Sequence, residues 1–194
     1  MKTICKNIYL FSELPEASKV KALEKWEPEY FWMDEGLESI KKGIEALGGT
    51  VRDWSIDPAH ASQSLVKWTD GNDYTDEDNM TGQRLRTWLL NNYYSVFYER
   101  KPLGGYPYKR RSKIQYAQTD CPFTGVCFDE DFLKPFRTFL KKPDRYTFED
   151  LVNEGIENCL QAIQSDYEYQ NSREALEEHF EANEYHFDEE GNLQ

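Results

Sequence analysis

The stretch that decides the fold reads TFEDLVNEGIENCLQAIQSDYEYQ and covers residues 147–170. Thr147 is followed three residues later by Asp150, which resembles a capping box at the start of a helix. The apolar residues that follow recur at spacings of three and four, so they share one helix face. They are Phe148, Leu151, Val152, Ile156, Cys159, Leu160, Ile163 and Tyr167. We therefore expect a helix over about 148–169 that buries this face in the core.

Helices and short strands are also predicted on both sides of this stretch, from apolar spacing and from runs rich in Val, Ile and Trp. In chain order they are a strand at 7–11, helices at 15–26 and 33–47, strands at 50–56 and 63–68, a helix at 85–97, a strand around 114–116, a helix at 129–142, a helix from 171 or 172, and a strand at 185–187. Pro135 should kink the helix at 129–142 or divide it. This mixture predicts an α+β protein with helices packed on a small, largely antiparallel sheet.

The chain length bounds the number of domains. A chain of 194 residues is long enough for one substantial core, so we expect a single domain spanning 1–194, with an insertion or variable region at about 70–118. No apolar run approaches the roughly 18 residues of a membrane span, and the first residues lack the pattern of a signal peptide. We therefore expect a cytoplasmic protein without membrane contact.

The charge is distributed unevenly along the chain. The net charge is −13, and residues 144–194 hold fifteen Asp or Glu against two Lys or Arg. Residues 84–113 have the opposite balance, with eight basic residues against Glu99 alone. A surface of this kind governs steering and the choice of partner. The negative net charge repels phosphate, so we expect no direct nucleic-acid binding.

Patterns that would indicate chemistry are incomplete. The four cysteines include a Cys121-x5-Cys127 pair but no second ligand pair, which favours buried free thiols over a zinc site or disulfides. The acidic stretch at 70–78 departs from the EF-hand pattern at its fifth and sixth positions.

A hydrolase triad is also incomplete. Asp57, His60 and Ser62 have the right residue types, but no Gly-x-Ser-x-Gly elbow accompanies them. We therefore expect no catalytic residue, no enzymatic activity, no cofactor and no bound metal.

Four glutamates near the C-terminus form the first candidate binding site. Glu174, Glu177, Glu178 and Glu181 fall at i, i+3, i+4 and i+7, so their carboxylates share one helix face. Such a face is typical of a solvated surface, and it also fits a recognition surface whose charges are spaced comparably to DNA phosphates. Both interpretations stay open.

A basic segment forms the second candidate site. Lys109, Arg110 and Arg111 follow Tyr106 and Tyr108, a combination that could hold a phosphate or a nucleotide through guanidinium forks and stacked rings. No glycine-rich phosphate loop accompanies them, which favours neutralisation of the chain's own acidic surface, or docking of a partner's acidic patch, over phosphate binding.

Both ends of the chain resemble a widespread group of small uncharacterised bacteriophage proteins. The resemblance rests on Tyr9-x-Phe11-x-Glu13-Leu14, which leads into a helix containing Lys19 and Ala22, and on Glu181-Ala182-Asn183-x-Tyr185-x-Phe187 ahead of Gly191. The stretch Thr124-Gly125-x-Cys127-Phe128-Asp129-Glu130-Asp131 is similar to some members. The whole resemblance spans about 1–40 and 120–194. It implies a phage origin and action in the host cytoplasm, and it transfers no catalytic residue.

The resemblance and the charge together predict a phage-encoded acidic interaction protein. It would inhibit a host defence or nucleic-acid-handling complex, in the manner of an anti-CRISPR or anti-restriction protein, by covering a basic cleft, with DNA mimicry as one form of that contact. A first alternative is a protein that sequesters a nucleotide signal through Arg110 and Arg111. A second is a metal-dependent hydrolase built on the acidic loops.

Overall fold

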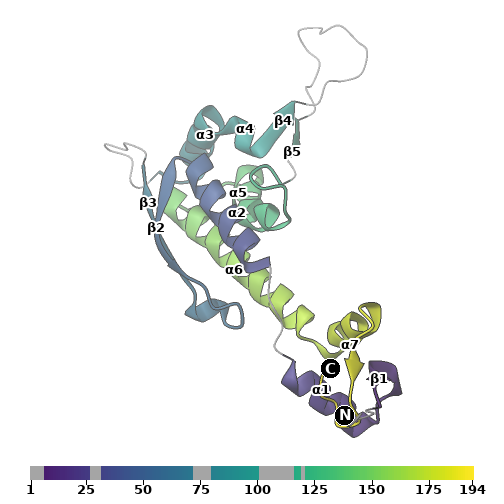
Figure 1. Cartoon of the computed structure of the whole chain (residues 1–194). Helices are drawn as coiled ribbons and strands as arrows, with labels where there is room; N and C mark the ends of the chain where they lie inside the picture. The colour runs from purple at the N-terminus through teal and green to yellow at the C-terminus, as the bar shows by residue number, and fades with distance from the viewer. Residues whose placement is uncertain (1–6, 27–31, 72–79, 101–115, 119–120) are drawn as a thin grey trace, which may run out of the picture. The chain divides into compact units, whose positions relative to one another are not determined.

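The structure, a computed structural model, describes residues 7–26, 32–71, 80–100, 116–118 and 121–194 (Figure 1). Its elements in chain order are β1 (Tyr9–Leu10), the 3-10 helix η1 (Phe11–Glu13), α1 (Glu16–Lys25), α2 (Trp32–Ala46), β2 (Gly49–Ser55), the 3-10 helix η2 (Ala61–Gln63), β3 (Leu65–Asp70), α3 (Gly82–Asn92), α4 (Tyr94–Phe97), β4 (Tyr98–Arg100), β5 (Tyr116–Gln118), α5 (Phe128–Lys141), α6 (Phe148–Gln170), α7 (Arg173–Ala182) and β6 (His186–Phe187). Helices packed with short antiparallel strands confirm the predicted α+β class.

The strands form three antiparallel pairs in the part of the chain that is described: β1 with β6, β2 with β3, and β4 with β5. The predicted pairing of the two strands after α2 is confirmed, with Gly49 opposite Asp70 and Trp54 opposite Val66. The register shifts between Val51 and Asp53, where Arg52 forms a bulge. Each pair stands alone, so the strands do not merge into one continuous sheet within these ranges.

The chain forms two compact units. The terminal unit consists of Met1–Tyr30 and Ser165–Gln194, and the central unit of Phe31–Gln164. The terminal unit is thus built from both chain ends, with the central unit inserted in sequence between them. The expectation of a single domain stays a prediction, and each unit is described by itself below.

The core of the central unit depends on the close approach of α5 to α2 and α6 (Figure 1). Phe132 of α5 is fully buried and occupies the space that two glycines leave free. A Cβ on Gly43 of α2 would lie 2.6 Å from the Phe132 ring, and one on Gly155 of α6 would lie 2.6 Å from the Phe132 carbonyl oxygen. The predicted burial of Leu151, Ile156, Leu160 and Ile163 is confirmed.

The predicted capping box at the start of α6 is also confirmed. The backbone N–H of Thr147 donates to Asp150 Oδ2 at 2.8 Å, and the backbone N–H of Asp150 donates to Thr147 Oγ1 at 3.1 Å. The hydrogen bond from the Thr147 backbone, reinforced by the Thr147 hydroxyl, lowers the pKa of Asp150.

One helix prediction is narrowed and another needs correction. Of the two alternatives predicted at Pro135, division of the helix at 129–142 is wrong, because α5 runs from Phe128 to Lys141 with Pro135 inside it and buried, and the kink stays a prediction. Proline removes one intrahelical hydrogen bond, and the buried aromatic face of α5 outweighs that loss. Conversely, the helix predicted over 85–97 is interrupted at Tyr93, where α3 ends and α4 begins.

The terminal unit has a small core built from both chain ends. Its buried residues are Phe11, Leu14, Ala22, Leu176, Phe180 and Phe187. Tyr9 of β1 pairs with Phe187 of β6, which brings the two terminal motifs together. The turn after β6 packs on α1, where Ser18 Oγ donates to the Glu189 carbonyl oxygen at 2.7 Å. Gly191 has a φ of 84°, and a Cβ there would collide with the Ser18 carbonyl oxygen.

Candidate functional site

The acidic face predicted from the sequence lies on α7, in the terminal unit; we use this name for Glu174, Glu177, Glu178 and Glu181. The predicted start of this helix is confirmed, because the Ser172 side chain accepts a hydrogen bond from the Ala175 backbone N–H at 3.3 Å. Glu174, Glu178 and Glu181 are exposed and Glu177 is half-buried.

The opposite side of α7 is fixed to the core. Phe180 is 1% exposed, and its ring centroid lies 5.1 Å from that of Phe11, 5.0 Å from Trp26 and 5.3 Å from Phe187. Ring contacts of this kind add to the stabilisation that burial provides. The acidic face is therefore presented by a helix whose orientation within the terminal unit is set by packing.

Arg173 stands at the N-terminal end of the acidic face. Its Nε lies 2.6 Å from Glu177 Oε1, and its Nη2 lies 2.7 Å from Glu16 Oε1 of α1. These hydrogen bonds raise the pKa of Arg173, and the bond from Arg173 lowers the pKa of Glu16. The spacing of Arg173 and Glu177 could have revealed their pair, whereas the Glu16 contact spans 157 positions and could not be found from spacing.

The other three carboxylates of the face are not neutralised. Within the described ranges, Glu174, Glu178 and Glu181 form no ion pair. Together with Arg173 and Glu177 they line a shallow hollow in the surface of the terminal unit. The arrangement presents negative charge in a fixed row and brings no acid–base pair or nucleophile to the same place, which suits binding of a positively charged surface.

The second candidate site, Tyr106, Tyr108, Lys109, Arg110 and Arg111, lies outside the described residues. The same is true of most of the acidic stretch at 70–78.

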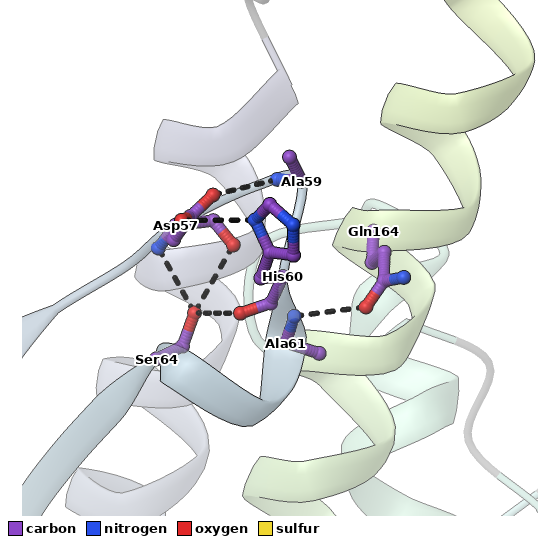
Figure 2. Close-up of polar contacts among 6 residues, drawn as sticks. All are labelled: Asp57, Ala59, His60, Ala61, Ser64 and Gln164. Atoms are coloured by element: carbon purple, nitrogen blue, oxygen red, sulfur yellow. Dashed lines mark hydrogen bonds and ion pairs between the residues drawn. The ribbon is translucent and has the colours of Figure 1, made fainter.

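Asp57 and His60 come together in the turn between β2 and β3, and Figure 2 shows their surroundings. His60 Nδ1 lies 3.2 Å from Asp57 Oδ2. The serine that joins them is Ser64, whereas the sequence singled out Ser62, which is exposed. Ser64 Oγ accepts from the Asp57 backbone N–H at 2.9 Å and donates to the Asp57 carbonyl oxygen at 3.2 Å.

This network holds the turn. A hydrolase triad needs the serine hydroxyl on an imidazole nitrogen, but the Ser64 hydroxyl is bonded to backbone groups (Figure 2). Gln164 of α6 fixes the turn from outside, since its Oε1 accepts from the Ala61 backbone N–H at 2.8 Å.

Asp129 explains the motif around Thr124 and Gly125. Its carboxylate is completely buried and accepts hydrogen bonds from the backbone N–H groups of Phe123, Thr124 and Gly125 at 2.8, 2.8 and 3.2 Å. The Thr124 hydroxyl donates to its second oxygen at 2.9 Å. A buried carboxylate satisfied in this way fixes a loop, so the motif has a structural role.

The three described cysteines are free thiols, as predicted. Cys159 is buried, its thiol donates to the Phe128 carbonyl oxygen at 3.2 Å, and burial raises its pKa. The expectation of burial is wrong for Cys127, which is exposed at the N-terminus of α5, and Cys121 is half-buried.

Two features are absent from the described part of the chain. No group of three or more His, Cys, Asp or Glu there is arranged to hold a metal ion. No described helix combines the length and apolar character needed to cross a membrane.

Comparison of the chain with protein-family models, with curated proteins and with solved structures gives no match. The resemblance to bacteriophage proteins therefore stays a prediction.

Proposed function

We propose that the chain is a phage-encoded acidic interaction protein that inhibits a host defence or nucleic-acid-handling complex, of the kind that anti-CRISPR and anti-restriction proteins block. The acidic face of α7 would occupy a basic cleft of the target in the host cytoplasm. The observation that carries the proposal is the row of exposed carboxylates at Glu174, Glu178 and Glu181, which no cation of the described residues neutralises.

The rigidity of the row supports this function. Binding costs free energy when side chains and loops must be ordered at the interface. Here Leu176 and Phe180 already fix the helix, and Ser172 caps it. Ordering on binding is then confined to the glutamate side chains.

The charge of the terminal unit supports it as well. This unit holds fifteen Asp or Glu against six Lys or Arg, a net charge of −9 out of −13. A concentrated field of one sign accelerates encounter with an oppositely charged partner and discourages like-charged ones.

DNA mimicry is the form of contact that the spacing favours. Along α7, Glu174, Glu178 and Glu181 are four and three residues apart, which corresponds to about 6 and 4.5 Å at a rise of 1.5 Å per residue. Phosphates of one DNA strand advance by about 3.4 Å per step. The carboxylates are thus spaced by between one and two phosphate steps, so a groove that binds the phosphates of one DNA strand could also accept these carboxylates.

The alternatives have less support. The nucleotide-binding segment lies outside the described residues, and nothing in the described ranges favours a hydrolase. Both stay predictions.

The test is a plating assay in bacteria that carry a restriction or CRISPR system and express the full chain. We expect a phage targeted by that system to form more plaques when the chain is present. The acidic-face variant, with Glu174, Glu177, Glu178 and Glu181 replaced by Gln, should lose this effect while keeping its helix content, because Gln and Glu have similar helix propensity.

A matched control separates the face from the net charge. Replacing Glu24, Glu157, Glu189 and Glu190 by Gln removes the same number of exposed carboxylates elsewhere. This control should protect the phage as the parent does. Protection by the acidic-face variant at the parental level, or no protection against any defence system tried, would contradict the proposal.

A further inference from the structure

The central unit carries a positive surface on α5 and the residue that follows it, which we call the basic ridge: Lys134, Arg137, Lys141 and Lys142. No carboxylate interrupts the sequence between its first and last member. The three lysines are exposed, and Arg137 is 13% exposed at its side chain, with Nη1 3.7 Å from Glu130 Oε1.

The basic ridge extends to the neighbouring helix. Arg86 of α3 donates from its Nε to the Leu140 carbonyl oxygen at 2.9 Å, which adds a cation beside the last turn of α5. A hollow of the surface follows the ridge and is lined by Glu130, Asp131, Lys134, Arg137, Thr138 and Lys141.

The lysines of the ridge differ from two other lysines of the central unit, Lys42 and Lys67. Lys42 and Lys67 lie 3.1 Å from the carboxylates of Glu45 and Asp53. By contrast, Lys134, Lys141 and Lys142 form no ion pair with any described carboxylate, although the chain has 36 acidic residues against 23 basic ones. The basic ridge thus offers positive charge to an acidic partner.

The spacing of the ridge matches the acidic face residue by residue. Lys134 and Lys141 are seven positions apart, as are Glu174 and Glu181, which is about 10.5 Å on either helix. If the two helices lie antiparallel, Lys134 stands opposite Glu181 and Lys141 opposite Glu174.

The same alignment places Arg137 opposite Glu178. Arg137 follows Lys134 by three positions, and Glu178 precedes Glu181 by three positions. Arg137 is largely buried beside Glu130, so the alignment depends on the two exposed lysines, Lys134 and Lys141.

We propose that the acidic face of one copy of this chain binds the basic ridge of a second copy. The contact is heterologous, because each copy uses a different surface, so it leads to head-to-tail chains or rings. Both copies have a negative net charge, but the Debye length is about 10 Å at 0.1 M salt, so repulsion between their distant charges is largely screened. The charges at the interface therefore decide whether the copies bind. Exposed ion pairs are individually weak, so we expect a dissociation constant of roughly 0.1–1 mM.

The test is sedimentation velocity of the full chain at protein concentrations from about 20 to 500 μM in about 100 mM NaCl. The parent should sediment faster as its concentration rises, and about 500 mM NaCl should weaken the association about tenfold by screening. Two variants each lack one surface: the acidic-face variant above and a ridge variant with Lys134, Lys141 and Lys142 replaced by Gln. Each variant alone should stay monomeric.

The equimolar mixture of the two variants is the decisive sample. Each variant retains one functional surface, so the mixture should form a dimer and nothing larger. A charge-matched control, with Lys21, Lys42 and Lys67 replaced by Gln, should associate like the parent. A monomeric parent at every concentration, a monomeric mixture, or variants that associate alone would overturn the inference.

This inference uses the acidic face of the proposed function but does not depend on a host target. The plating assay distinguishes the two, because the ridge variant should still protect the phage. If the ridge variant protects while the mixture stays monomeric, self-association is wrong and the proposed function stands. If the mixture dimerises while neither the parent nor any variant protects the phage, self-association stands and the proposed function is wrong.

Discussion

The terminal and central units differ in how much charge they carry for their size. The terminal unit, the smaller of the two, has a net charge of −9, and its buried cluster among the described residues consists of six side chains. The larger central unit has 21 Asp or Glu against 17 Lys or Arg, a net charge of −4. Repulsion between like charges opposes a compact state. Repulsion between like charges therefore destabilises the terminal unit more than the central unit, although the terminal unit has the smaller core. A charge that a fold retains at this cost is what we expect of a binding surface.

The largest effect is expected from a charge placed in the core of the central unit. Ile156 is 5% exposed on the buried face of α6, so Ile156→Asp would bury an unpaired carboxylate. We expect a loss of more than about 4 kcal/mol in the free energy of unfolding. Urea denaturation measures this loss, and hydrogen exchange should show α2 and α5 losing protection. Ile156→Val is the control and should cost about 1 kcal/mol. Unchanged stability of the Asp variant would show that α6 does not pack as described.

A cavity in the terminal unit should have the next largest effect. Phe180 is almost fully buried and contacts the rings of Phe11, Trp26, Tyr185 and Phe187, so Phe180→Ala should cost about 3–5 kcal/mol. Hydrogen exchange should rise in 7–26 and 171–194, while the amides of α2 and α5 keep their protection. Equal loss of protection in both units would mean that they unfold together and would remove the distinction between them.

Close helix packing in the central unit predicts a smaller loss. The Cβ of Gly155→Ala would lie 2.6 Å from the backbone oxygen of Phe132, so α5 and α6 must separate, at a cost of about 1–3 kcal/mol. Gly125 is the comparison: a Cβ there meets nothing within 4 Å, but its φ of 85° is unfavourable for alanine. Gly125→Ala should cost about 1 kcal/mol. A larger loss at Gly125 than at Gly155 would contradict the described packing.

The smallest effect concerns pH. The Thr147 backbone N–H lowers the pKa of Asp150, so this carboxylate stabilises the folded state above its unfolded pKa of about 4. That contribution is lost as the pH falls through the lower, folded value.

Asp150→Asn should therefore weaken the protein at pH 7 by up to about 1 kcal/mol and change it less at pH 2, as measured by urea denaturation. In the terminal unit Arg173 lowers the pKa of Glu16, so that contribution has the same sign. An equal effect of Asp150→Asn at both pH values would show that the carboxylate charge does not matter to the cap.

Local patterns predicted most of the elements. The spacing of apolar residues gave α6 with its buried face, Thr147 and Asp150 gave its cap, and Ser172 marked the start of α7. The pairing of β2 with β3 also followed from neighbouring segments. These predictions succeed because helix periodicity, caps and short hairpins depend on residues close in the chain. Local patterns left open whether Pro135 divides the helix at 129–142, and burial of the aromatic face of α5 decided that it does not.

The sequence by itself determined most of the helices, the starts of α6 and α7, the α+β class and the placement of four glutamates on one helix face, because each depends on spacing along the chain. Only the tertiary structure decided which of those carboxylates stay free. Arg173 reaches Glu177 on its own helix and Glu16 on α1, which leaves Glu174, Glu178 and Glu181 without a cation among the described residues. It also decided that β1 pairs with β6 and that Phe132 fits against Gly43 and Gly155. Such contacts join residues far apart in sequence, so they depend on how whole elements pack, which no local pattern records.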